Sequence, residues 1–148
     1  MIRRLLHSLV LGVALAGCSH PLAPTRAVAE AQQLWQRTRP TNYRFTLAVG
    51  CFCGFVGPVV IEVHGDSVVG RRVQATGDVL DPRFGTSYTT IDGLFTVINQ
   101  AYADHADHVD VRFDPTRGYP TSIAIDREER AADDEVGYAV TGFEALPP

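Results

Sequence analysis

The chain has 148 residues, with thirteen arginines and no lysine against seventeen acidic residues, and its formal net charge is −4. This length is typical of one domain and is enough to bury a hydrophobic core. A hydrophobic fraction of 45% with only 20% charged residues excludes a chain that is disordered over most of its length. The acidic balance, without any dense stripe of arginines, argues against a nucleic-acid partner.

The first eighteen residues are typical of an export signal. Arg3 and Arg4 form a positive start, and a largely apolar run of about a dozen residues follows at 5–16. This run is shorter than the roughly 20 residues that a membrane-spanning helix needs, so we expect residues 1–17 to be cleaved. The signal ends in a run that resembles the bacterial lipobox, made up of Leu15, Ala16, Gly17 and Cys18.

In a lipoprotein of this kind, Cys18 becomes the mature N-terminus and carries a lipid that holds the protein to the membrane. The alternative is an ordinary signal peptide that happens to contain a cysteine. Ser19 follows in place of an aspartate, which by enterobacterial sorting rules favours the outer membrane, facing the periplasm. We expect residues 18–26 to be a tether and residues 27–148 to be a single globular domain. Cleavage removes two arginines and no acid, so the mature charge is −6.

In the first half of the domain, apolar residues at helical spacing predict a helix at residues 27–38, which includes Trp35. Strict alternation from Tyr43 to Val49 predicts a strand at residues 42–49. Two further strands are predicted at residues 59–64 and 68–75, joined by a tight turn at Gly65 and Asp66. A polar connection follows from Thr76 to Tyr88.

The second half repeats this order. Thr89, with Asp92 in a capping-box position, predicts the start of a helix that extends to Ala106. Alternating residues then predict three strands, around Val109 to Phe113, Ile123 to Ile125, and Val136 to Val140. We therefore expect an α+β fold with a meandering antiparallel sheet of about six strands and two helices on one face. The alternative is a small barrel-like curl of the same strands around the second helix.

Cys51 and Cys53 are the first candidates for chemistry. Once Cys18 is lipidated they form an even pair, in a compartment where disulfides persist. A bond between them would shape the glycine-rich connection from Gly50 to Pro58 and would add little global stability, because the closed loop is so short. The alternatives are a thiol-disulfide redox site, a metal site or free thiols. No basic residue lies between Gly50 and Pro58 that would stabilise a thiolate.

Other polar clusters give weaker signals. His105 and His108 lie three residues apart near a helix end, but no third ligand lies at a recognisable distance, so no metal site is predicted. His64 has no obvious partner, and residues 126–135 hold six acids without the spacing of a calcium loop. No catalytic constellation, phosphate loop or cofactor motif can be assembled, so no catalytic residue and no cofactor are expected.

Several short motifs of the domain occur together in one order, and they are Asn42-Tyr43-Arg44-Phe45, Cys51-x-Cys53, Pro58, Thr90-Ile91-Asp92 with Leu94-Phe95, Asp114-Pro115, Gly118-Tyr119-Pro120 and Asp133 to Tyr138. In these motifs the chain resembles a family of small bacterial exported proteins and lipoproteins of unknown function, domain of unknown function 6174. The resemblance implies an envelope-anchored globular domain and implies no activity.

We therefore expect a non-enzymatic lipoprotein of the cell envelope. Its sheet, or loops that carry Phe52, Phe55, Phe84 and Tyr88, would contact an envelope protein partner. The alternative for these aromatic side chains is burial in the core. The alternative is a redox or metal-binding protein centred on Cys51 and Cys53.

Overall fold

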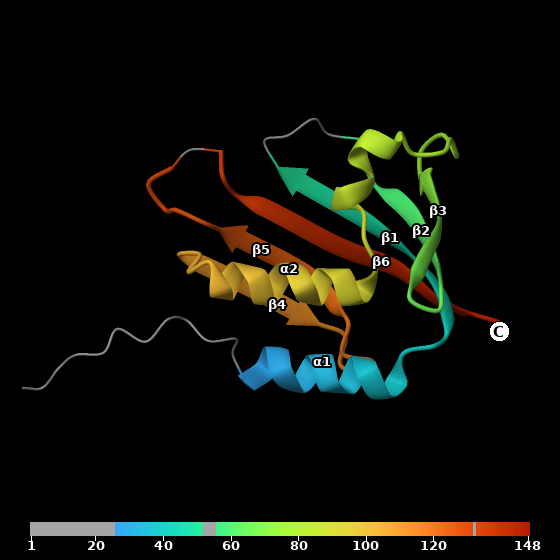
Figure 1. The fold of residues 1–148 in the computed structure, drawn as a ribbon, viewed down its shortest axis with the longest axis horizontal. Coiled ribbons are helices and arrows are strands. Elements are labelled where there is room, and N and C mark those ends of the chain that lie inside the picture. The colour runs from blue at the N-terminus through green and yellow to red at the C-terminus, as the bar shows by residue number, and fades with distance from the viewer. Residues whose placement is uncertain (1–25, 52–55, 132) are drawn as a thin grey trace, which may run out of the picture.

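The structure, a computed structural model, describes residues 26–51, 56–131 and 133–148. It contains two α-helices, α1 (Arg26–Thr38) and α2 (Ile91–Ala103), and a short 3-10 helix η1 (Pro82–Ser87) (Figure 1). The six strands are β1 (Asn42–Cys51), β2 (Val59–His64), β3 (Ser67–Val73), β4 (His108–Phe113), β5 (Pro120–Asp126) and β6 (Val136–Leu146). They form one antiparallel sheet in the order β3-β2-β1-β6-β5-β4, which confirms the predicted α+β fold.

The sheet consists of two three-stranded meanders that meet at its centre. The first contains β1, β2 and β3, and the second contains β4, β5 and β6. The first and last strands join them, in a register that runs from Asn42 opposite Leu146 to Cys51 opposite Val136. The barrel alternative is wrong, because β3 and β4 are the two ends of an open sheet.

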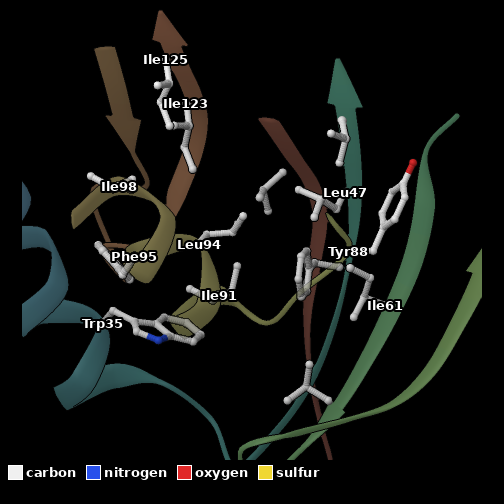
Figure 2. Packing of buried hydrophobic residues seen from close by; sticks show 14 of the residues in the cluster. Trp35, Leu47, Ile61, Tyr88, Ile91, Leu94, Phe95, Ile98, Ile123 and Ile125 are labelled. Carbon is white, nitrogen blue, oxygen red and sulfur yellow. The ribbon is translucent and has the colours of Figure 1, made fainter. Parts of the chain in front are cut away.

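The core lies against one face of this sheet. Alternate residues of β1 point to opposite faces, and Tyr43, Phe45, Leu47 and Val49 are buried as their spacing predicts. Each meander supplies further buried side chains to the same cluster, namely Val59, Ile61, Val63, Ile123, Ile125 and Val140. Figure 2 shows Trp35 of α1 and the apolar side chains of α2 in this cluster. Trp35 has no exposed surface, so it is central to the packing of α1.

The start of α2 differs from its predicted form by one residue. The N-cap is Thr90, whose hydroxyl oxygen accepts a hydrogen bond from the Gly93 N–H at 3.0 Å. Thr89 is therefore not the cap, and Asp92 lies in the first turn, where a carboxylate interacts favourably with the helix dipole. The helix ends at Ala103 and not at Ala106, and His105 soon afterwards has a φ of 60°, which a helix cannot accommodate.

β6 continues beyond its predicted end because of a β-bulge. Its register against β1 shifts between Arg44 and Thr46, and Gly142 in this segment has a φ of 58°, which glycine adopts without steric cost. Beyond the bulge, the Phe143 ring stacks on Tyr119, with 4.6 Å between ring centroids. The bulge thus aims Phe143 into the core at a position that simple alternation does not predict.

The apolar stripe of α2 should be a main support of the sheet. Leu94 and Ile98 are fully buried, so replacing either with alanine should lower the free energy of unfolding by about 2 to 5 kcal/mol. Thr96→Ala on the exposed side of the same helix is the control and should change it by less than about 0.5 kcal/mol. Chemical denaturation measures all three. Losses below about 0.5 kcal/mol at both buried positions would contradict the packing described above.

Candidate functional site

Asp92 connects α2 to α1. Its carboxylate accepts hydrogen bonds from Trp35 Nε1 at 3.2 Å and from Gln36 Nε2 at 2.6 Å. The Arg39 guanidinium also binds it at 3.1 Å and reaches Asp66, in the turn between β2 and β3, at 2.9 Å. Because both carboxylate oxygens of Asp92 accept hydrogen bonds, this network holds together α1, α2 and the turn between β2 and β3.

Tyr43 lies beside this network. Its phenol group shares a hydrogen bond with the backbone of Ile91 at the start of α2. Burial raises the pKa of Tyr43 far above its usual value of 10.0. The side chain therefore stays neutral at any physiological pH, and it supports the core instead of supplying a base.

The turn between β4 and β5 packs against α1. Asp114 Oδ1 accepts hydrogen bonds from the N–H groups of Thr116 and Arg117, at 3.0 and 2.7 Å. Arg117 in turn donates to the Thr38 carbonyl at 3.0 Å. A Cβ on Gly118 would lie 2.3 Å from the Ala31 carbonyl oxygen, so only glycine fits there. The motif from Asp114 to Tyr119 is thus explained by the docking of a helix.

Gly118→Ala should therefore destabilise the protein strongly. Gly118 has a φ of 79° in addition to its contact with α1, so we expect a loss of at least about 2 kcal/mol in the free energy of unfolding. Gly85→Ala is the matched control, because Gly85 has no positive φ and open space around its Cβ position, and it should cost less than about 0.5 kcal/mol. Thermal or urea denaturation of both variants compares them, and equal effects would contradict this account of the turn.

The strand residues that alternate with the core residues form a surface of small side chains. Gly50 lies opposite Gly137, Ala48 opposite Ala139, and Ala124 of β5 opposite Gly137 on its other side. We call this surface the small-residue face, and it consists of Ala48, Gly50, Ser122, Ala124, Gly137, Ala139 and Thr141, with the buried Thr46 at one end. No motif in the sequence pointed to this surface, although every second residue is small within 46–50, 122–124 and 137–141.

Charged side chains border the small-residue face on both sides. Arg44 and Glu144, on the paired strands β1 and β6, form an ion pair at 2.7 Å. His64 contacts Glu62 at 2.9 Å on β2, which supplies the partner that the sequence did not indicate. On the far side, β4 exposes three polar or charged residues at alternate positions, His108, Asp110 and Arg112. The small-residue face is therefore a surface without large side chains, and the residues around it include both acidic and basic ones.

The cysteine segment begins at one end of the sheet. Cys51 is the last residue of β1, is half-buried, and lies opposite Val136 at the start of β6. The acidic connection at 126–135 therefore leads into the strand next to Cys51. Cys53 and Cys18 lie outside the described residues, so the Cys51–Cys53 bond and the lipidation of Cys18 stay predictions.

Acidic residues near His105 and His108 bind local groups. Asp107 accepts a hydrogen bond from the Glu129 N–H at 2.8 Å, which links the two loops at this end of the sheet. Asp104 lies 3.6 Å from the Arg127 guanidinium. In the described parts of the chain, no group of three or more histidine, cysteine or acidic side chains is arranged to hold a metal ion.

The two aromatic residues of the long connection differ in burial. Tyr88 is buried, and its hydroxyl donates to the Gly57 carbonyl at 2.8 Å. Phe84 is half-buried and packs against the core. Of the two alternatives for these side chains, burial in the core therefore holds for Tyr88, whereas a contact role of the half-buried Phe84 stays a prediction. Phe52 and Phe55 lie outside the described residues.

A family described as a family of unknown function (DUF6174) matches residues 27–145 of the chain. The chain belongs to this family. The match confirms the resemblance to this family, whose function is unknown. No curated protein and no solved structure matches the chain. Of the helices in the described ranges, none has the length and hydrophobicity needed to cross a membrane.

We expect Cys51 and Cys53 to be joined in a bond that shapes their loop. The mature protein should then show no free thiol before reduction. Because the closed loop is tiny, replacing both cysteines with serine should lower the free energy of unfolding by no more than about 2 kcal/mol. Thiol counting with and without reductant, and denaturation of the double variant, test this. A mixed disulfide with another envelope protein, trapped when only Cys53 is replaced, would instead support a redox site.

Proposed function

We propose that the protein is a non-enzymatic lipoprotein of the bacterial cell envelope that binds a protein partner through the small-residue face. The observation that carries this proposal is a broad sheet face paved with glycine, alanine, serine and threonine. A solvated sheet face is usually polar, whereas this face has short side chains that would let another protein approach the backbone closely. The charged borders would orient the partner and fix its register.

The proposal takes both helices to cover the same face of the sheet. Three observations support this arrangement. The Trp35 ring of α1 contacts the Tyr43 ring at 5.4 Å between centroids, and Tyr43 belongs to the buried set of β1. α2 packs against β4 and β5. The buried residues of both helices and of the strands belong to one core cluster. The small-residue face would then be left for a partner.

The chemistry of the described residues supports binding over catalysis. Catalytic groups need a position where a nucleophile, a base and an oxyanion donor converge. The carboxylate of Asp92 is occupied by three donors, and the neighbouring Tyr43 has a raised pKa. The charged residues beside the small-residue face include the ion pair between Arg44 and Glu144. These groups are arranged to hold the fold and to present a surface.

The membrane anchor of the proposal is Cys18. The lipobox-like run ends there, and α1 begins only eight residues later, at Arg26. A fully extended segment of that length spans no more than about 29 Å. A lipid on Cys18 would therefore keep the domain close to the membrane surface, which we expect to be the periplasmic surface of the outer membrane.

Lipidation is tested by mass spectrometry of the mature N-terminus. We expect a diacylglyceryl modification on Cys18, and we expect Cys18→Ser to release the domain from the membrane fraction or to leave the signal uncut. The matched control is Ser19→Ala, which keeps the thiol and should remain membrane-bound. An unmodified N-terminus further along the chain would contradict the proposal.

Partner binding is tested by photo-crosslinking in intact envelopes. A photoreactive amino acid at the exposed Ala139 should yield one discrete crosslinked product, whereas the same group at the exposed Thr96 of α2 should not. A second variant, Ala124→Arg, places a long charged side chain on the small-residue face and should abolish the product. Equal products from Ala139 and Thr96, or none from Ala139, would contradict a role for this face.

A further inference from the structure

We propose that the open edge of β3 accepts an extended, acidic strand from a partner protein. β3 is one of the two edge strands of the sheet. The segment after it covers only its C-terminal half, where Leu80 N–H donates to the Arg71 carbonyl and Val73 N–H donates to the Asp78 carbonyl. Within the described ranges, residues 67–70 have no strand on their outer side, so their outward backbone groups are available to another chain.

This edge also carries the exposed apolar side chains. Among the described residues, the two large hydrophobic residues that are exposed are Val69, at 56%, and Val79, at 72%. Both line one hollow of about 360 Å³, together with Leu80 and Pro82. Val69 is the extra residue of a β-bulge against β2, and a bulge can redirect a side chain outward. The hollow is therefore a place where an aliphatic side chain of an added strand would be buried.

The opposite edge of the same sheet shows what β3 lacks. β4 presents exposed His108, Asp110 and Arg112 at alternate positions, and charged residues on an edge strand oppose the addition of another chain. At the open end of β3, Val69 and Gly70 take the place of such residues. The β4 edge is thus protected by polar and charged side chains, whereas the uncovered half of β3, residues 67–70, carries no charged side chain.

Charge determines the kind of strand that fits. The Arg71 Nε donates to the Tyr88 carbonyl at 2.6 Å, and Arg72 donates to the Gly77 carbonyl at 3.1 Å. In the described ranges, neither arginine forms an ion pair with a carboxylate. Both line the hollow beside Val69. Arg72 lies on the face opposite to the core residue Ile61, and carboxylates on that face of the added strand would supply its missing partner, so the strand should alternate aliphatic with acidic residues.

The recognition would follow the known logic of strand addition. Backbone hydrogen bonds to residues 67–70 provide affinity, and the hollow with its two arginines provides specificity. This inference depends neither on lipidation nor on the small-residue face. Its test measures peptide binding at the edge of β3 and not at the small-residue face, so a negative result would not contradict the proposed function.

The test is selection of a random displayed peptide library against the full chain. Peptides enriched on the protein should alternate β-branched residues with aspartate or glutamate. Their affinity should fall at least tenfold on Val69→Lys and on Val79→Lys, which place a charge in the hollow. Arg72→Gln should weaken them by about two- to fivefold, the size expected for an exposed ion pair. Ala103→Lys, which adds the same charge at the exposed end of α2, should leave the affinity unchanged.

Four outcomes would overturn the inference. They are the absence of any enriched peptide, the enrichment of basic peptides, equal affinity for the Val69→Lys variant, and self-association. The last would appear in sedimentation equilibrium as a dimer that Val69→Lys dissociates, and it would assign the edge to a second copy of the chain. Because Val69 and Val79 are both exposed, these variants should fold, and circular dichroism with thermal unfolding verifies this.

Discussion

β1 and β6 pair along almost their whole length at the centre of the sheet, and this pairing joins the two meanders. Without it, β1 and β6 would each be an edge strand with unpaired backbone groups. Each meander is a set of hairpins between neighbours in sequence, whereas this contact brings together residues about 100 positions apart, such as Arg44 and Glu144. Closing so long a loop costs conformational entropy, which the shared core offsets. The small-residue face exists only because the small residues of both strands then lie side by side.

Local patterns predict the elements of this fold well. Short segments show which of their side chains will be buried, because apolar residues recur at the period of the strand or helix. Examples are the alternation in residues 42–49 and 59–64 and the helical spacing around Leu94. The pairing of the first strand with the last is not recorded locally. The bulge at Gly142 cannot be predicted from local sequence either, because a single glycine in a strand does not indicate which strand pairs with it.

The candidate site was less predictable than the fold. Cysteines, histidines and acidic runs attract attention in a sequence because of their chemistry, but Asp92 and Asp114 are used here to hold helix α1 in place. The sequence left open whether Tyr88 is exposed or buried, and it is buried because the connection after β3 folds back so that its hydroxyl donates to the Gly57 carbonyl. Conversely, Ala48 and Ala139 have no reactive groups, and only their cross-strand register reveals the surface that they form.

The central position of β6 has a consequence for how the protein is made. β6 follows all the other described strands in the chain, so the middle of the sheet is synthesised after both of its edges (Figure 1). Until then β1 has no neighbour on one side, and the core beneath it stays open. A chain with this topology completes its core only once β6 has been synthesised, and a change that removes β6 takes away a central strand instead of trimming an edge.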